Sequence, residues 1–493
     1  MWLQFVNVLL VLVDSLNRAD VPAYGGTSVA MPNLGRLARR AWRFDNHFVG
    51  SLPCMPARRE IFTGFKELMW RPWGGLEPGD RRLPRLIEAA GLSTAIVTDH
   101  YHYWEESANG YLQSFQQTEL VRGHEWDNWR GPIAPDEPVP DWVERIERWR
   151  PRAGRRYYAN VRAFHGEEDF FPARVFRAAT ARLRELRAPF FLHVESFDVH
   201  EPFHVPEPYR SLFGAAADDE RFTLWPPYQD PERLAAFMAE TTPDELLFIR
   251  ARYLAKVAMV DRWLGVLLDA LDDLGSWDDT AVVFTTDHGH DLGARGVFGK
   301  QYPHWDSHAN IPLFVWHPAF PGNGRAVDAL TSTVDLHSTL AELAGAEADA
   351  PHGRSLVPLL AGEVAHRDAL LYGTFGQGVC CTDGEWTIFK SPVGSPLYAY
   401  SSQLVESLVV DGLAAPDAQG TFVPGVAYPQ WRIPTEIRPL SDENFLFHRP
   451  SDPGQERNLW DSEPERRERM LQVVRTVVEA EGAPPEQLTR LGL

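Results

Sequence analysis

Cysteine is scarce in this sequence. The chain contains three: Cys54 and the adjacent pair Cys380 and Cys381. So few cysteines exclude the disulfide framework that holds small secreted domains together. The adjacent pair is better interpreted as two small core residues than as a redox pair.

Lysine is also rare, and no segment is strongly basic. Only four lysines stand among 48 lysine and arginine residues, and the formal net charge is −20. This charge argues against nucleic acid, and against a long polyanion, as the preferred partner. An anionic substrate would need a local cluster of cations. A lysine within a site motif is therefore harder to ascribe to chance.

Long hydrophobic runs are missing as well. The apolar run Val8–Val13 is too short to span a bilayer and is followed by an aspartate. Residues Met1–Phe5 carry no positive charge and precede no cleavage site for a secretory signal. We therefore predict a cytoplasmic protein without a membrane segment.

What the chain does contain is a series of short apolar runs separated by helical patterns. Runs this rich in branched residues are typical of strands buried on both faces of a parallel sheet. One helical pattern, with apolar residues three and four apart from Val257 to Leu271, stops at Gly275, a suitable C-cap. Strands alternating with helices predict a doubly wound α/β fold. The predicted strands are Val8–Val13, Thr94–Val97, Phe190–Val194, Ala281–Thr285 and Pro312–Trp316.

The pattern changes after about Gly345. Thr382-Asp383-Gly384 lies between two apolar stretches and predicts a hairpin. The pattern of Glu463–Ala480 predicts a final helix. We therefore predict a catalytic α/β domain over residues 1–350. Residues 351–493 would form a smaller α+β subdomain, an antiparallel sheet with a helix, packed on it.

Two stretches look like insertions. Gly131–Arg156 is rich in proline, tryptophan and arginine, and Glu201–Pro243 is rich in proline and acidic residues. The composition of neither stretch is typical of a hydrophobic core. Loops of this length in compact enzymes are often lids or substrate walls.

The segment Cys54-Met55-Pro56-Ala57-Arg58 combines several features of an anion site. Pro56 fits the first turn of a helix, so Cys54 would lie at the helix N-terminus, where backbone amides favour an anion. Arg58 would lie on the same face one turn later. A cysteine at a helix start is usually structural, but this spacing is much rarer.

Acidic residues follow two of the predicted strands. Asp14 comes directly after Val8–Val13, and Asp287-His288 follows Ala281–Thr285. Ligands of open α/β sheets bind beyond the carboxyl ends of strands, so both groups would face one site. The alternative for each aspartate alone is a helix cap or a turn.

Cys54–Arg58 resembles the C-x-P-[S/A]-R signature of the sulfatase family. The following Thr63-Gly64 also matches, whereas Phe65 stands where the family has arginine. The resemblance implies an alkaline phosphatase-like fold with a three-layer α/β/α arrangement. It also implies that a formylglycine-generating enzyme oxidises Cys54 to formylglycine, the family's nucleophile.

The same resemblance implies a metal site. Asp14, Asp287 and His288 match the family's ligands, and residue 54 would add an oxygen once Cys54 is oxidised. Many sulfatases have tandem aspartates at the first position, where this chain has Asp14-Ser15. We expect one divalent cation. Ca²⁺ is the first expectation, and Mn²⁺ is the alternative because the His288 imidazole would be a ligand.

Two further segments resemble family elements that contact the substrate. Phe197–Phe203 is similar to P-H-x-P-[YF], with His200 in the histidine's place, and Gly299-Lys300 matches a lysine that contacts the sulfate. The structural alternative for His200 is an ordinary core histidine. The resemblance covers roughly residues 6–345 and extends weakly to Phe445–Leu459, where Asp452–Leu459 matches a further family motif.

Thr98–Trp104 lies where many sulfatases have G-K-W-H. His100 replaces the lysine and His102 keeps the histidine, so we predict substrate contact for His100 and a catalytic role for His102. A structural cluster of rings is the other interpretation. Nearby tryptophans could stack on a sugar or aryl ring, or belong to the core: Trp70, Trp73, Trp104, Trp126 and Trp129.

The predicted function is hydrolysis of a small anionic sulfate ester, either a sulfated sugar or an aryl sulfate. Arg58 and Lys300 would stabilise developing charge, His200 would protonate the leaving oxygen, and His102 would accept a proton. The first alternative is a phosphonate monoester or phosphodiester hydrolase with the same nucleophile. A silent anion-binding protein is the second. The oligomeric state stays open, with a homo-oligomer as one outcome.

Overall fold

The computed structural model describes residues 6–105, 108–214, 221–228, 230–348, 350–394, 396–403 and 416–493. Residues 1–5, which bear on the predicted lack of a signal, lie outside this set. Among the helices of the described ranges, none has both the length and the apolarity needed to cross a bilayer. The cytoplasmic location stays a prediction.

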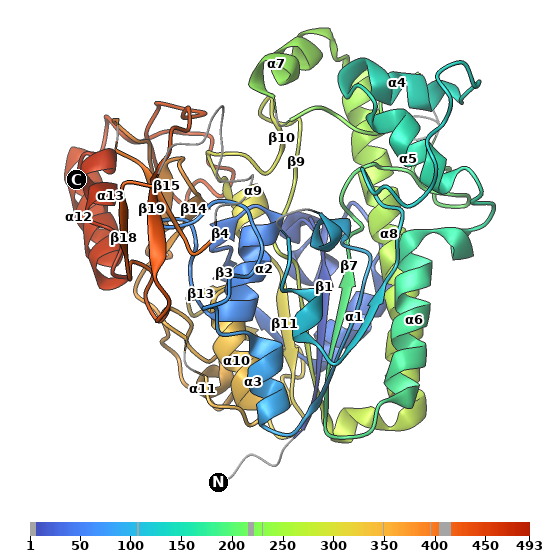
Figure 1. Ribbon diagram of the computed structural model, residues 1–493, viewed down its shortest axis with the longest axis horizontal. Helices are drawn as coiled ribbons and strands as arrows, with labels where there is room; N and C mark the ends of the chain where they lie inside the picture. The colour runs from blue at the N-terminus through green and yellow to red at the C-terminus, as the bar shows by residue number, and fades with distance from the viewer. Residues whose placement is uncertain are drawn as a thin grey trace.

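A mostly parallel sheet forms the centre of the molecule (Figure 1). Its strands in the described residues are β1 (Asn7–Val13), β2 (Trp42–Phe44), β5 (Ser93–Thr98), β6 (Gln117–Leu120), β7 (Phe190–Ser196), β8 (Thr280–Thr285), β11 (Leu313–Trp316) and β12 (Ala326–Val327). They lie in the order β12-β2-β11-β8-β1-β7-β5-β6. β11 runs antiparallel to both neighbours, while β8, β1, β7, β5 and β6 are parallel. The five predicted strands and the α/β fold class are confirmed.

Helices cover both faces of this sheet. Odd-numbered residues of β1 pack in one core, and even-numbered residues pack in a second core on the opposite face. This alternation explains why β1 is apolar throughout. The first core includes α1 (Pro32–Arg40), α6 (Phe171–Glu185) and α8 (Pro243–Leu274); the second includes α2 (Cys54–Thr63), α3 (Leu83–Ala89) and α10 (Asp335–Leu343).

Helix α8 contains the predicted periodic pattern and ends where expected. Thr242 caps its start by accepting a hydrogen bond from the Glu245 amide, and Gly275 ends it with a φ of 64°. Such a left-handed conformation favours glycine because it lacks a Cβ.

The two predicted insertions contain helices of their own. The structure places α4 (Asp141–Trp149) and α5 (Ala153–Val161) in or beside the first, and α7 (Pro231–Glu240) in the second. Figure 1 shows all three at the end of the molecule where β9 (Asp291–Leu292) and β10 (Phe298–Gly299) lie. Residues 215–220 and 229 of the second insertion are outside the described residues.

The C-terminal region forms a second sheet that also includes a strand from the N-terminal part of the chain. Within the described residues its order is β20-β16-β15-β14-β4, from β4 (Ser51–Leu52), β14 (Leu370–Thr374), β15 (Val379–Thr382), β16 (Trp386–Lys390) and β20 (Phe445–His448). β4 pairs with β14 in parallel, and the other pairs are antiparallel. The predicted hairpin at residues 382–384 is confirmed. The boundary near residue 350 stays a prediction.

Further elements complete the fold. The predicted final helix is confirmed as α12, whereas α13 was not predicted. Their bounds, with the remaining short elements, are α12 (Pro464–Ala480), α13 (Glu486–Leu491), α9 (Asp306–Ala309), α11 (Val357–Leu360), β3 (His47–Phe48), β13 (Thr331–Ser332), β17 (Tyr398–Ser401), β18 (Ala418–Gly420) and β19 (Gln430–Pro434).

Candidate active site

Four predicted site residues meet beyond the carboxyl ends of β1 and β8. Asp14 follows β1, Asp287 and His288 follow β8, and Cys54 is the first residue of α2. One potential ligand atom from each of the four lies within 4.8 Å of the others, and all four side chains are buried. The topology thus brings residues far apart in the sequence into one cluster.

Arg58 binds this cluster together. Its fully buried guanidinium donates to Asp14 Oδ2 (2.8 Å), to Glu195 Oε1 (2.6 Å) and to Asp287 Oδ2. Burial opposes the charged form, but the three carboxylates outweigh it and raise the pKa of Arg58 well above its usual range. One cation faces three carboxylates, so the cluster keeps an excess of negative charge.

This excess makes the cluster a fitting site for a cation. Burial, and then the nearby Asp287 carboxylate, raise the pKa of Asp14 to about 7. His288 donates its Nδ1 hydrogen to the Gly289 carbonyl (2.9 Å), which leaves the Nε2 lone pair for a ligand. Cys54 Sγ lies 3.2 Å from that Nε2 atom. Two carboxylates and an imidazole nitrogen form a donor set for a divalent cation.

His200 and Lys300 lie together beside the cluster. His200 Nδ1 lies 2.9 Å from Glu125 Oε1 and 3.0 Å from Glu201 Oε2, while its Nε2 contacts Lys300 Nζ. Burial opposes protonation of His200, but Glu201, followed by Glu125, outweighs it and raises its pKa well above the usual value. Glu125 and Glu201 thus favour a proton on His200, and one hydrogen is shared between His200 Nε2 and Lys300 Nζ.

The two histidines after β5 have different surroundings. His102 lies on a 3₁₀ turn, 2.8 Å from Glu105 Oε2, and lines the cavity described below. His100 is fully buried, with Nε2 3.8 Å from Asp14 Oδ2 and neither ring nitrogen hydrogen-bonded within the described residues. His100 thus lies behind the cluster, while His102 lies at the cavity.

A cavity of about 490 Å³ opens onto Cys54. The predicted Cys54, His102, His200 and Lys300 all lie on its wall, and the other lining residues are largely aromatic or neutral. These are Pro53, Trp73, Tyr101, Glu105, Glu125, Trp126, Tyr228, Gln301, Tyr302, Thr374, Gln377 and Leu440.

The five tryptophans that were candidates for stacking on a sugar or aryl ring lie in different places: the cavity wall, the core and the surface. Trp73 and Trp126 line the cavity, and Trp70 is fully buried in the core of the C-terminal region. Trp104 and Trp129 instead carry arginine side chains over their rings. Two of the five are thus placed to contact a substrate.

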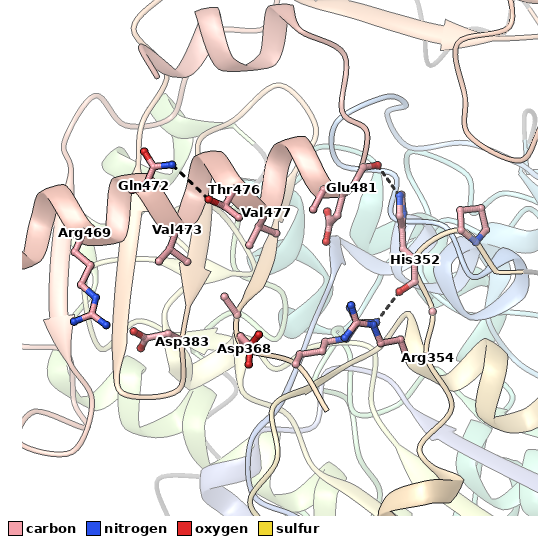
Figure 2. Close-up of a pocket in the computed structure, with 15 residues that line it drawn as sticks. His352, Arg354, Asp368, Asp383, Arg469, Gln472, Val473, Thr476, Val477 and Glu481 are labelled. Atoms are coloured by element: carbon pink, nitrogen blue, oxygen red, sulfur yellow. Dashed lines mark hydrogen bonds between the residues drawn. The ribbon is translucent and has the colours of Figure 1, made fainter. Parts of the chain in front are cut away.

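A larger groove, of about 820 Å³, lies elsewhere (Figure 2). Its wall combines side chains of α12, such as Gln472 and Val477, with Asp368, His352 and Arg354. None of the predicted site residues lines it. The chemistry therefore selects the smaller cavity at Cys54 as the candidate active site.

Several site residues escaped prediction from the sequence. Glu195 lies in β7 and binds Arg58, Glu125 and Glu201 hold His200, and Tyr228 and Thr374 line the cavity. A charged residue inside an otherwise buried strand could have drawn attention to Glu195. Glu125 offers no local signal, because it meets His200 only through the tertiary fold.

Comparison with known proteins decides the family. The sulfatase family pattern matches residues 6–346. The chain belongs to the sulfatase family.

Relatives within this family have diverse names. The multifunctional alkaline phosphatase superfamily protein PehA of Trinickia caryophylli is 28% identical over 400 residues, covering 72% of this chain and 77% of that protein. Choline-sulfatase of Rhizobium meliloti is 25% identical over 415 residues and covers 77% of each. Human iduronate 2-sulfatase is 27% identical, covering 72% of this chain and 68% of the relative.

Solved structures agree in fold. The phosphonate monoester hydrolase of Agrobacterium radiobacter aligns with a TM-score of 0.67 at 21% identity, over 97% of this chain and 95% of the other. A protein solved with its substrate D-glucosamine-2-N,6-O-disulfate aligns with a TM-score of 0.69 at 16% identity, over 98% and 99%. The fold of this chain therefore matches those structures over nearly its whole length.

Proposed function

We propose that this sulfatase-family hydrolase cleaves sulfate esters of small alcohols or phenols, using formylglycine made from Cys54 and one divalent cation. The observation that carries the proposal is the meeting of Asp14, Cys54, Asp287 and His288 within 4.8 Å, beside Lys300 and His200 on one cavity wall. A maturation enzyme for Cys54 and a small anionic ester are the partners that this function requires.

Asp14, Asp287, His288 and the side chain of residue 54 would hold the cation. When bound, it would polarise the ester oxygens and favour the ionised form of a hydroxyl on residue 54. The carboxylates favour Ca²⁺, and the His288 nitrogen makes Mn²⁺ the alternative. Arg58 donates to both Asp14 and Asp287 and so fixes the position of the two carboxylates.

The remaining site residues would act on the substrate. Lys300 places a positive charge beside Cys54 and would stabilise the sulfate oxygens. His200, protonated under the influence of Glu125 and Glu201, would donate a proton to the leaving oxygen. His102 lies on the wall next to Glu105 and would accept a proton as sulfate is released, while His100 would support the anion from behind the cluster.

A phosphonate monoester or phosphodiester is the second candidate substrate class. The observation that favours this class is that one aspartate, Asp14, follows β1, where many sulfatases have two in tandem. Ser15 occupies the place of a second aspartate and donates to Asp14 Oδ1 (2.7 Å). The proteins of known structure that this chain resembles include phosphonate monoester hydrolases. Sulfate and phosphonate esters are nearly the same size, so turnover must separate them.

The first test is mass spectrometry of the tryptic peptide 44–58, from protein made together with a formylglycine-generating enzyme. We expect the aldehyde or its hydrate in place of the Cys54 thiol. The matured protein should then turn over 4-nitrophenyl sulfate faster than 4-nitrophenyl phenylphosphonate. The opposite order would select the second candidate.

Substitution of the nucleophile gives a matched test. C54A should lower turnover by about a thousandfold or more, because the residue acts as part of a unit. C380A, which removes a buried cysteine of β15, serves as the control and should retain turnover. Wild-type turnover by the C54A protein would disprove the proposal.

A further inference from the structure

The wall of the candidate active-site cavity carries aromatic rings and carboxylates around His102. The ring centroid of His102 lies 4.2 Å from that of Tyr101 and 4.9 Å from that of Trp73. His102 Nδ1 lies 2.8 Å from Glu105 Oε2, and its Nε2 lies 3.9 Å from Glu125 Oε2. Two rings and two carboxylates thus surround one histidine, and all four of these side chains line the cavity.

Trp126 extends this group, because it follows Glu125 and also lines the cavity. Its side chain is 36% exposed and lies near Trp225, with 6.0 Å between ring centroids. Glu125 has a φ of 41°, a left-handed conformation that costs free energy and persists only where the surroundings enforce it. The preceding His124 is anchored, with Nε2 3.0 Å from Asp198 Oδ1. The fold therefore fixes where the indole stands.

We call these five wall residues the aromatic–acidic patch: Trp73, Tyr101, Glu105, Glu125 and Trp126. Arginine side chains cover many aromatic rings of the protein, as Arg122 does at Trp104, with 4.3 Å between guanidinium carbon and ring centroid. Among the described residues, no arginine or lysine covers a ring of the patch in this way. The negative face of an aromatic ring attracts a cation within about 6 Å. The rings of the patch can therefore receive a cation that comes with the substrate.

The charges on the cavity wall also favour a cation at the patch. Lys300 is the one lysine among the described residues that line the cavity, and arginine is absent from them. Lys300 lies beside Cys54, where the proposed reaction places the sulfate. The rest of the wall is left for the alcohol part of the ester, which would meet the carboxylates of Glu105 and Glu125. The Glu105 side chain is 35% exposed and thus accessible from the cavity.

We propose that the aromatic–acidic patch is a subsite for an ammonium group on the leaving group, so that the preferred substrates are sulfate esters of cationic alcohols or phenols. Cation–π attraction, strongest for tryptophan, holds the ammonium, and Glu105 and Glu125 supply the opposite charge. Such an ester has no net charge, so the negative field of the chain does not repel it. This inference rests on the proposed ester hydrolysis.

The test compares esters of the same shape that differ in one charge. Sulfate release by the matured enzyme is measured with the 3- and 4-(trimethylammonio)phenyl sulfates and with the matching tert-butylphenyl sulfates. The two leaving groups also differ in acidity, so the readout is the change, from wild type to variant, in the charged-to-neutral ratio of kcat/KM. For at least one isomer, W126L should lower this ratio by about threefold to tenfold, mainly through KM. E105Q, which keeps the shape of the side chain, should lower it by about twofold to fivefold.

W104L is the matched control, because Trp104 is exposed and adjacent to Glu105 but does not line the cavity. It should keep the wild-type ratio. A ratio equal to wild type in both W126L and E105Q, for both isomers, would overturn the proposal.

Failure of the wild type to release sulfate from any ester would instead count against the proposed function. Isothermal titration of the unmatured protein with phenyltrimethylammonium still tests the subsite in that case, because it needs no turnover. Binding that weakens in W126L supports the subsite. Equal binding by wild type and W126L, or no binding by either, would overturn it.

Discussion

Arg58 is the residue on which the electrostatics of the site depend. It is fully buried and pairs with Asp14, Glu195 and Asp287, each of which is also fully buried. Removing one partner of a buried charge cluster leaves the others uncompensated, which typically costs about 3–5 kcal/mol. The same guanidinium therefore supports the fold and holds Asp14 and Asp287, two of the proposed metal ligands, in place.

His200 gives a prediction on pH. Glu125 helps to raise the pKa of His200, so E125Q should lower that pKa while leaving an isosteric partner for Nδ1. If His200 acts as the general acid, the alkaline limb of kcat/KM should shift to lower pH in E125Q. The measurement is a pH–rate profile with one aryl sulfate, and an unshifted limb would exclude His200 as the titrating group.

Glu60, away from the chemistry, predicts a dependence of stability on pH. Burial raises its pKa to about 8, against its ordinary 4.5, although the Ser51 amide and hydroxyl donate to it. Between these two values the unfolded chain releases a proton that the folded protein keeps. The free energy of unfolding should therefore fall as pH rises from 4.5 to 8, by up to roughly 1.4 kcal/mol per pH unit from this group.

E60Q keeps a neutral side chain of the same shape and should remove this contribution. The thermal unfolding midpoint of wild type minus that of E60Q should decrease steadily from pH 5 to pH 8. A constant difference would show that Glu60 is ionised in the folded protein.

Residues in local motifs were predictable, and residues that meet only in the fold were not. Cys54 could be read from the spacing of its own segment, and Asp14 and Asp287 from their positions at strand ends. Glu125 and Thr374 reach the cavity from loops and strands whose pairing depends on the whole chain. For His100, the motif predicted a substrate contact, while the structure places the ring behind the cluster. Its role stays a prediction.

At the scale of elements, two helix ends offer a matched comparison. α2 ends at Gly64 with a φ of 66°, and α8 ends at Gly275 with a φ of 64°. A Cβ on Gly64 would lie 2.4 Å from the Ala350 Cβ, whereas a Cβ on Gly275 would meet open space.

G275A should therefore cost about 1 kcal/mol, the penalty of the left-handed conformation alone. G64A should cost about 1–3 kcal/mol more because of overpacking. Thermal midpoints of the two variants in parallel provide the check. An equal loss in both would mean that the contact at Ala350 relaxes freely. Since α2 begins with Cys54, G64A should also impair turnover more than G275A does.

Strong periodicity made some elements predictable from sequence. The continuous apolar run of β1 and the three-and-four spacing in α8 leave little choice of structure. The helices α4, α5 and α7 were not predicted, because proline, tryptophan and arginine dominate the surrounding sequence and conceal short amphipathic patterns. α13 has six residues, too few for a periodic signal.

At the scale of the molecule, the net charge of −20 should lower kcat/KM for highly charged anionic substrates relative to less charged ones. A second sulfate on the leaving group would be repelled by the general field, and the described residues that line the cavity include no arginine and no lysine besides Lys300. Salt screens such long-range repulsion, with a Debye length of about 10 Å at 0.1 M.

We therefore expect kcat/KM for D-glucosamine 6-sulfate to exceed that for D-glucosamine-2-N,6-O-disulfate at low ionic strength, and the ratio to fall as salt is added. Initial rates over a salt series measure it. A ratio that does not respond to salt would mean that local contacts alone discriminate between the two.

The pairing of β4 with β14 joins the segment before Cys54, the proposed nucleophile, to the part of the cavity wall that the C-terminal third of the chain provides. In the proposed reaction Cys54 and the proposed metal ligands would carry the chemistry, while Thr374, Gln377 and Leu440 line the cavity where the alcohol part of an ester would lie. Selection can therefore alter the C-terminal wall without disturbing the reacting groups. A chimaera that carries this third from a relative should therefore keep the reaction and change its substrate specificity, provided that the paired strands β4 and β14 remain compatible.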